Sequence, residues 1–341
     1  MTYWNTKLDM QKLHQTWKKT NFTKHVDDLW GSLQVPGVER DEIPPLDNPH
    51  FQSVSKALES LPPRSAMIVV PTKNEVKAYR VDDVMLHEIV NDKVDGEPIA
   101  VTFCPLCNSA IVFKRVINGQ NIRLGVSGML RNFDLVMWDD VTESWWQQFT
   151  GQAILGEWTG KQLEALPSQI LSIEQVSEQY PSSQVLLKTE NDPHPPAHQT
   201  GDFKERGASM VDTSKIFATT IKNQPVAISY ERLRKEKVIN YKVNGFQIVV
   251  LFNEEISDMG IESGENKGQA LMYSSRNRER DLHFEKATQE TYTDQETNST
   301  WNLFGEAISG PLKGENLVKL ISYPHFKKPW FEFYPNTLFL S

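Results

Sequence analysis

An internal repeat is the feature of this sequence that most limits its fold. After a shift of 149 positions, Lys73-Asn74, Ala78, Asn91, Lys93-Val94, Gly96, Ile99, Val101 and Phe103 recur as Lys222-Asn223, Ala227, Asn240, Lys242-Val243, Gly245, Ile248, Val250 and Phe252. A later block, Asp139, Thr142, Ser144 and Trp146, matches Asp294, Thr297, Ser299 and Trp301. The repeat predicts two copies of one structural unit that pack together.

The sequence pattern predicts β structure in each copy. Between residues 68 and 126, short runs alternate apolar and polar residues, and Asp95-Gly96 and Asn118-Gly119 separate some of them. Both dipeptides supply the positive φ angles that two-residue type I′ hairpin turns need. The predicted fold is therefore mainly β with a few short helices, in two tandem copies of one β-rich unit plus an N-terminal arm.

The repeat also sets the expected domain boundaries. Residues 1–65 form an arm with two short helices, because Leu8, Leu13 and Trp17 recur at helical spacing and a start signal precedes the segment 51–61. Residues 66–188 form the first β-rich unit, 189–212 a polar linker, and 213–341 a second, degenerate unit. His194 and His198 fall in this linker, where a solvated loop is the simpler interpretation than a metal tract.

Charge and hydropathy narrow the function classes. The formal net charge of -8 is spread along the chain without long runs of one sign, which argues against a nucleic-acid partner. No segment approaches the roughly 18 consecutive apolar residues of a membrane helix, and the first 21 residues are polar. We expect a cytoplasmic protein with a small-molecule substrate. The oligomeric state is not predicted.

Differences between the two copies point to the functional residues. Shared positions are most simply fold requirements, whereas features of one copy only are candidates for function. The chain has two cysteines, Cys104 and Cys107, and both lie in the first copy. The second copy has Glu236, Lys237 and Asn253 in place of His87, Glu88 and Cys104, and an insertion at 254–268 where Cys107 would lie.

Hairpin register suggests a third ligand beside the cysteines. A two-residue turn at Asp95-Gly96 pairs Val94 with Glu97, and counting outward brings His87 opposite Cys104. Cys107 would fold back from the Pro105-Leu106 turn. Two thiolates and one imidazole leave an open position on Zn²⁺ and also suit Cu(I), so His87, Cys104 and Cys107 are the expected metal ligands.

A cluster of polar residues follows the second hairpin and consists of Ser127, Arg131, Asn132 and Asp134. Arg131 could hold an anionic group and Asp134 could transfer a proton, so we expect Arg131, Asn132 and Asp134 to be catalytic residues. Alternatively, Arg131 and Asp134 pair with each other on the surface. The sequence thus predicts a metal-dependent (Zn or Cu) enzyme, of a redox kind, that acts on a small molecule.

Two other functions fit the cysteine pair. The first is a dithiol oxidoreductase without metal, although that mechanism relies on a helix N-terminus beneath the cysteines, and a β-like run, 110–116, follows here. The second is a non-catalytic binding module in which the cysteines hold a turn through metal or simply pack.

Three blocks of the sequence together carry a resemblance to a known family: 87–92 (HEIVND), 101–107 (VTFCPLC) and 127–137 (SGMLRNFDLVM). They resemble the bacterial and archaeal family catalogued as domain of unknown function 3179, over about Ile43 to the C-terminus. The resemblance implies a duplicated β-rich domain and makes the six site residues family-motif positions. It implies no reaction. Asn108, Phe133 and Trp138 depart from the family pattern, which commonly has Gly, a small residue and Tyr there.

Overall fold

The computed structural model describes residues 8–189, 192, 214–254, 268–278 and 280–341. His194, His198 and most of the predicted linker and insertion lie outside the described residues. Within these ranges the chain is mainly β with short helices, as predicted. The helices are α1 (Met10–Thr16), α2 (Leu29–Ser32), α3 (Val54–Leu58), α4 (Val81–His87), α5 (Ile173–Gln179), α7 (Tyr230–Glu236) and α8 (Lys327–Phe333).

The first half of the chain forms three five-stranded sheets. The first has the order β16 (Gln169–Ser172), β4 (Ala66–Pro71), β5 (Val76–Arg80), β17 (Gln184–Leu187) and β3 (His50–Ser53). The second has β15 (Ala165–Leu166), β8 (Ser109–Lys114), β7 (Glu97–Cys104), β6 (Ile89–Val94) and β2 (Leu46–Asp47). The third has β14 (Ala153–Leu155), β13 (Trp145–Gln147), β12 (Asp134–Asp139), β11 (Leu124–Arg131) and β1 (Leu33–Gln34). A small ribbon pairs β9 (Val116–Ile117) with β10 (Gln120–Asn121).

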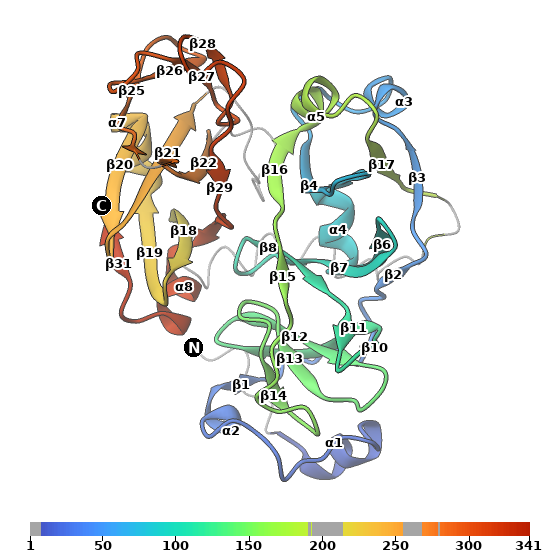
Figure 1. The fold of residues 1–341 in the computed structure, drawn as a ribbon. Coiled ribbons are helices and arrows are strands. Elements are labelled where there is room, and N and C mark those ends of the chain that lie inside the picture. Colours follow the sequence, from blue (N-terminus) through green and yellow to red (C-terminus); the bar gives the residue numbers. More distant parts are fainter. Residues whose placement is uncertain (1–7, 190–191, 193–213, 255–267, 279) are drawn as a thin grey trace.

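The second half forms three four-stranded sheets. The first has the order β30 (Tyr323–Phe326), β18 (Lys215–Ile221), β19 (Gln224–Ser229) and β31 (Leu338–Leu340). The second has β29 (Val318–Lys319), β22 (Gln269–Ser274), β21 (Phe246–Asn253) and β20 (Val238–Val243). The third has β28 (Ala307–Ser309), β27 (Thr300–Asn302), β26 (Thr291–Asp294) and β25 (Phe284–Lys286). A ribbon pairs β23 (Arg276–Asn277) with β24 (Arg280–Asp281). This half, yellow to red in Figure 1, lies beside the first half, with β30 next to β8.

The N-terminal arm contains more than the two predicted helices. Its three short strands each extend one sheet of the first half: β1 pairs with β11, β2 with β6 and β3 with β17. The helix expected over residues 51–61 is shorter, because 50–53 is a strand and helix α3 begins only after Ser53, whose side chain accepts a hydrogen bond from the backbone N–H of Lys56. The arm is therefore part of the sheets.

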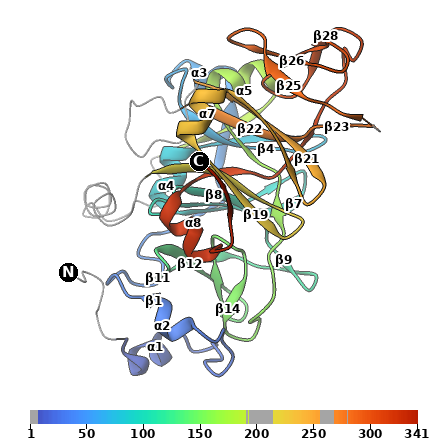
Figure 2. The same cartoon turned by 90° about the vertical axis from the view of Figure 1, so that its left-hand side faces the viewer.

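Aromatic packing also fixes the arm. Trp17 is buried against Trp138 and Trp145, with ring centroids 5.7 and 5.2 Å away. Figure 2 shows α1 and α2 below the third sheet, near β14. The arm also approaches Gly128 closely: a Cβ there would collide with the carbonyl oxygen of Val38. Gly128 also has a φ of 80°. Glycine suits this position because it has no Cβ to collide with Val38 and because it adopts a positive φ without strain.

The predicted hairpin turns are confirmed. Val94 pairs with Glu97 in the antiparallel β6–β7 ladder. Asp95 and Gly96 have φ angles of 54° and 79°, and Asn118 and Gly119 have 52° and 77°, as type I′ turns require. The register of the second sheet of the first half therefore follows from local turn chemistry.

One buried hydrogen-bond pattern occurs in both halves. Asp139 accepts from the indole N–H of Trp146 at 2.9 Å and from the backbone N–H of Ser144. Asp294 accepts from the indole N–H of Trp301, also at 2.9 Å, and from the backbone N–H of Ser299. These shared residues satisfy buried polar groups and close a turn, as the sequence analysis expected.

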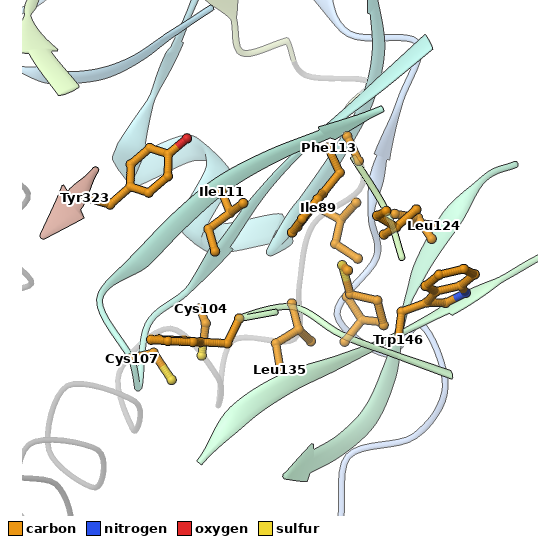
Figure 3. Close-up of a cluster of buried hydrophobic side chains, with 14 of the residues drawn as sticks. Ile89, Cys104, Cys107, Ile111, Phe113, Leu124, Leu135, Trp146 and Tyr323 are labelled. Atoms are coloured by element: carbon orange, nitrogen blue, oxygen red, sulfur yellow. The ribbon is translucent and has the colours of Figure 1, made fainter. Parts of the chain in front are cut away.

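One large apolar cluster joins the two halves. It contains Cys104, Cys107 and Ile111 from the first half together with Tyr323 and Trp330 from the second. Figure 3 shows Tyr323 on a neighbouring strand, with Ile111 and the two sulfur atoms nearby. The cysteines therefore lie where the halves meet. No helix in the described ranges is long and apolar enough to cross a membrane.

Candidate metal centre

The two cysteines lie at the end of the β7–β8 hairpin. Cys104 is the last residue of β7 and pairs with Ser109, the first residue of β8. Cys107 lies in the connection, and its backbone N–H donates to the carbonyl oxygen of Cys104. Asn108 has a φ of 49°, a conformation that Asn tolerates better than most residues, which explains how it stands where Gly is common.

Asp134 completes a group of three possible ligands. Its carboxylate and the two sulfur atoms all lie within 4.8 Å of one another. Asp134 Oδ2 accepts from Gln147 Nε2 at 2.5 Å and from the backbone N–H of Phe149 at 2.8 Å, whereas Oδ1 has no hydrogen-bond partner. All three residues are at most 1% exposed. The centre thus offers two sulfur atoms and one free carboxylate oxygen in a buried place.

A tight turn brings Asp134 to the cysteines. Asn132 and Phe133 connect β11 to β12 with φ angles of 51° and 65°, and Arg131 pairs with Asp134 across the turn. Positive φ is costly for a large residue such as Phe, so the surroundings must hold Phe133 in place. Its backbone N–H donates to Gln34 of the arm, and its carbonyl oxygen accepts from Cys107 Sγ at 3.4 Å and, more weakly, from Cys104 Sγ at 3.8 Å. Asn132 therefore belongs to the turn that shapes the centre.

Arg131 is held by protein groups on several sides. Its Nη2 donates to both carboxylate oxygens of Asp28, at 2.9 and 2.7 Å, and its Nε donates to Ser32. Its Nη1 donates to Gln147, the same residue that donates to Asp134. Arg131 thus reaches Asp134 through Gln147, and its ion pair is with Asp28 of the arm.

The prediction that His87 lies opposite Cys104 in the hairpin is wrong. Strand β6 begins at Ile89, and His87 is the last residue of helix α4. Its Nδ1 lies 2.9 Å from the carbonyl oxygen of Pro44. Glu88, with a φ of 56°, ends the helix, so the register cannot be extended past Ile89. In the part of the chain described, the ligand group around the cysteines contains Asp134 and does not contain His87.

Sequence reasoning underrated Glu88. An unbroken strand would turn this side chain to the other face, but the left-handed backbone of Glu88 invalidates that expectation. Glu88 is 7% exposed and interacts electrostatically with Asp134 and Cys104. The sequence signals for it were its position within the first motif block and its replacement by Lys237 in the second copy. A second carboxyl group therefore lies close enough to influence the centre.

Burial controls the protonation of these groups. It raises the pKa of both thiols, that of Cys107 well above its usual range. Burial raises the pKa of Asp134 to about 6, and burial together with the charge of Asp134 raises that of Glu88 to about 8. Without a cation the thiols stay protonated and are poor nucleophiles. A bound divalent cation would stabilise the thiolates and the carboxylate.

These features define a mainly β protein with a buried centre of two cysteines and one carboxylate, enclosed between the two halves of the chain. The model of the family described as "Protein of unknown function (DUF3179)" matches residues 40–337, so the chain belongs to this family, as its motifs implied. Neither the curated proteins nor the solved structures contain a match to the chain.

Proposed function

We propose that this protein is a metal-dependent enzyme that acts on a small molecule, with Cys104, Cys107 and Asp134 as the metal ligands. The observation that carries the proposal is the grouping of the two sulfur atoms and one Asp134 carboxylate oxygen within 4.8 Å of one another. A buried carboxylate oxygen without a partner is costly, and a bound cation would remove that cost. Three protein ligands would also leave a position for substrate or water.

Zn²⁺ is the metal we propose first. Zn²⁺ accepts sulfur and carboxylate oxygen together, whereas Cu(I) prefers sulfur and imidazole. Asp134 in place of His87 therefore favours zinc over copper. A zinc ion would supply Lewis-acid chemistry, and the redox reaction expected from the sequence would require copper.

The remaining polar residues take supporting roles in this proposal. Arg131 positions Asp134 through Gln147, and the Asn132–Phe133 turn carries Asp134 to the cysteines. Because Asp134 would bind the metal, Glu88 is the better candidate to hold or transfer a proton near it. These assignments replace the direct catalytic roles expected for Arg131, Asn132 and Asp134.

The dithiol alternative has less support. An attacking thiol needs a lowered pKa, and burial raises the pKa of both thiols here. The residues after Cys107 continue into strand β8, so the connection does not enter a helix that would stabilise a thiolate. A metal site also needs both thiols reduced, and we therefore propose a reducing compartment such as the cytoplasm.

A structural metal site is the second candidate, and the burial of all three ligands favours it. Structural zinc sites have four protein ligands, so this candidate needs one more. Glu88 lies outside the group within 4.8 Å but interacts electrostatically with Asp134 and Cys104, so a movement of its side chain would be needed to supply it. The two candidates therefore differ in whether Glu88 binds the metal.

Metal content tests the proposal. Untagged wild-type protein should hold about one zinc per chain by elemental mass spectrometry. Cys104→Ser and Asp134→Asn should lose the metal, whereas His87→Ala should keep it. Metal-free wild-type protein with two titratable thiols would contradict the proposal, and loss of metal from His87→Ala would return His87 to the ligand set.

Cobalt substitution then separates the two candidates. An open catalytic position binds added azide and shifts the visible spectrum of the Co²⁺ protein, whereas a closed four-ligand site gives no shift. Glu88→Gln should keep its metal if the position is open. Loss of metal from Glu88→Gln, with no azide shift in the wild type, would favour the structural site.

We also propose that the chain arose by duplication of one β-rich unit, with units at about 66–188 and 213–341. The matching strand orders of the three sheets in each half support this proposal. The equivalent hydrogen bonds that Asp139 and Asp294 accept from Trp146 and Trp301 also support it. In this view the second unit lost the cysteines and serves to enclose the centre of the first.

A further inference from the structure

Buried polar atoms without hydrogen-bond partners gather beside the metal centre. In the described part of the chain, nine such side-chain atoms occur, and six of them belong to five residues: Asn108, Ser109, Asp134, Gln148 and His325. Each of these residues is at most 2% exposed. Native proteins leave few buried polar groups unpaired, so a concentration in one place needs a cause.

Contacts between these residues show that they share one neighbourhood. Asn108 and Ser109 follow Cys107 directly, and Gln148 Nε2 donates to the carbonyl oxygen of Ser109 at 3.2 Å. Phe149 links Asp134 to the second half: its N–H donates to Asp134, and its ring packs against the ring of His325 at 4.8 Å. On the other side, the N–H of Phe326 donates to the carbonyl oxygen of Cys107.

The fold itself does not require these polar groups. Gln148 follows Trp146 by two positions, and in the second half Leu303 follows the matching Trp301 by two positions and packs in an apolar cluster. Asn108 has two unpartnered side-chain atoms and stands at a positive φ that Gly would adopt without strain. A chain selected for stability alone would place apolar side chains or Gly here.

We propose that Asn108, Ser109, Gln148 and His325 bind a small uncharged molecule with both hydrogen-bond donors and acceptors, such as a primary amide, between the two halves. The inference deepens the proposed function and rests on it in one respect: Asp134 would be a ligand of the proposed metal, and the other four residues would bind the substrate.

The chemistry of the four residues selects this class of ligand. Asn108 offers a donor and an acceptor, Ser109 a hydroxyl, Gln148 the acceptor Oε1 and His325 the ring atom Nδ1. None of the four side chains is a lysine or arginine, and apolar side chains lie beside them: the ring of Trp330 lies 5.0 Å from that of His325. An anion would find no countercharge among these residues, and two thiolates and one carboxylate would already neutralise the proposed Zn²⁺, so an anion would lose its hydration without compensation.

Three molecules of equal size test the proposal on the metal-loaded protein: acetamide, acetate and acetone. Ligand-observed NMR titration should show saturable binding of acetamide, in the millimolar range that so small a ligand can reach. Acetate, which is charged, and acetone, which has no donor, should bind at least about tenfold more weakly.

Variants assign the binding to the four residues. Gln148→Leu and Asn108→Gly should each weaken acetamide binding at least about tenfold, and Asn108→Gly should also raise the melting temperature because it removes two unpaired buried atoms. Ser183→Ala is the matched control, since Ser183 Oγ is also buried and unpartnered but lies at the start of β17. It should bind acetamide like the wild type.

Three outcomes overturn the inference. The first is no binding of any of the molecules, which would mean that water satisfies these atoms. The other two are binding of acetate as tight as that of acetamide, and unchanged acetamide binding in both variants. Metal content measured on the same samples keeps the two proposals separate. Wild-type protein that binds acetamide but holds no metal contradicts the proposed function alone. Wild-type protein that holds zinc but does not bind acetamide contradicts the inference alone.

Discussion

Arg131 connects the N-terminal arm to Asp134, beside the two cysteines, through Gln147. Its guanidinium donates to Asp28 and Ser32 of the arm and to Gln147, and Gln147 donates to Asp134. Groups that orient a metal ligand typically change metal affinity 10–100-fold when removed. The orientation of Asp134 therefore depends on a residue that does not itself reach the metal.

Replacing Arg131 tests this dependence. Arg131→Met should lower zinc affinity about tenfold or more, because Gln147 Oε1 loses its donor and Asp134 loses support. Asp28→Ala is the control: Asp28 is 65% exposed, and its ion pair contributes at most about 1 kcal/mol to the free energy of unfolding. Zinc affinity can be measured by competition with a chelator. An equal loss of affinity in both variants would contradict the positioning role.

Glu88 gives the metal-free protein a pH-dependent stability. Its pKa is about 8 in the folded protein, against an ordinary value of 4.5, so the folded state holds an extra proton between these pH values. Stability of the wild type should therefore fall as pH rises from 4.5 to 8. Glu88→Gln does not titrate, so its melting temperature should exceed that of the wild type by a margin that grows across this window. A constant margin would mean that Glu88 has an ordinary pKa.

At the scale of elements, the turns that close β12–β13 and β26–β27 are equivalent. Asp139→Ala should destabilise the protein by about 3 kcal/mol, because several buried donors, including the indole of Trp146, lose their acceptor. Asp294→Ala should have a similar effect through Trp301. Urea unfolding measures both, and zinc content should stay near one per folded chain. A negligible effect of Asp294→Ala would show that the two turns differ.

Elements that depend on neighbouring residues could be predicted from the sequence. The hairpin turns at Asp95-Gly96 and Asn118-Gly119 carry local signals, and the structure has them. Strands β1, β2 and β3 were missed because each is two to four residues long and pairs with a strand far away in the sequence. Their position depends on tertiary contacts, which residue patterns do not reveal.

The residues that gather around the cysteines were predicted only in part, because some of them depend on contacts between distant parts of the sequence. The cysteine pair is a local motif, and Asp134 was expected to take part, but as a proton donor or acceptor. His87 was misplaced because one residue, Glu88, adopts a left-handed conformation between helix α4 and strand β6. The sequence gives no sign of this single change of backbone direction.

For the whole molecule, polar contacts as well as the apolar cluster hold the halves together. Tyr323 and Ser168 hydroxyls lie 2.9 Å apart, and Gln175 donates to Gln269 at 3.0 Å. Lys319, from the second half, donates to Gln169 of the first and lines a cavity there with Ser168 and Gln269. Burial lowers the pKa of Lys319 to about 7. A lysine of this kind lowers stability where it must stay charged.

Lys319→Met should therefore stabilise the protein in a pH-dependent way. Below pH 7 the folded wild type bears the cost of a half-buried, poorly hydrated charge, so the variant should exceed it most in melting temperature there. Between pH 7 and the ordinary value of 10.5 the wild type gains stability and the difference should shrink. A difference that does not change with pH would contradict the lowered pKa.

The edge strands of the arm have a consequence for synthesis on the ribosome. Residues 33–53 leave the exit tunnel before their partners, because β1 must wait for β11, β2 for β6 and β3 for β17, which ends at Leu187. Such distant pairings form late, because closing long loops is slow. Gln34, which holds the turn at Phe133, arrives with β1. Tyr323 and Trp330, which pack with both cysteines, are made later still. The nascent chain therefore carries the cysteines without this cover until most of it has been made, and in the proposed function this interval is when a metal ion would enter.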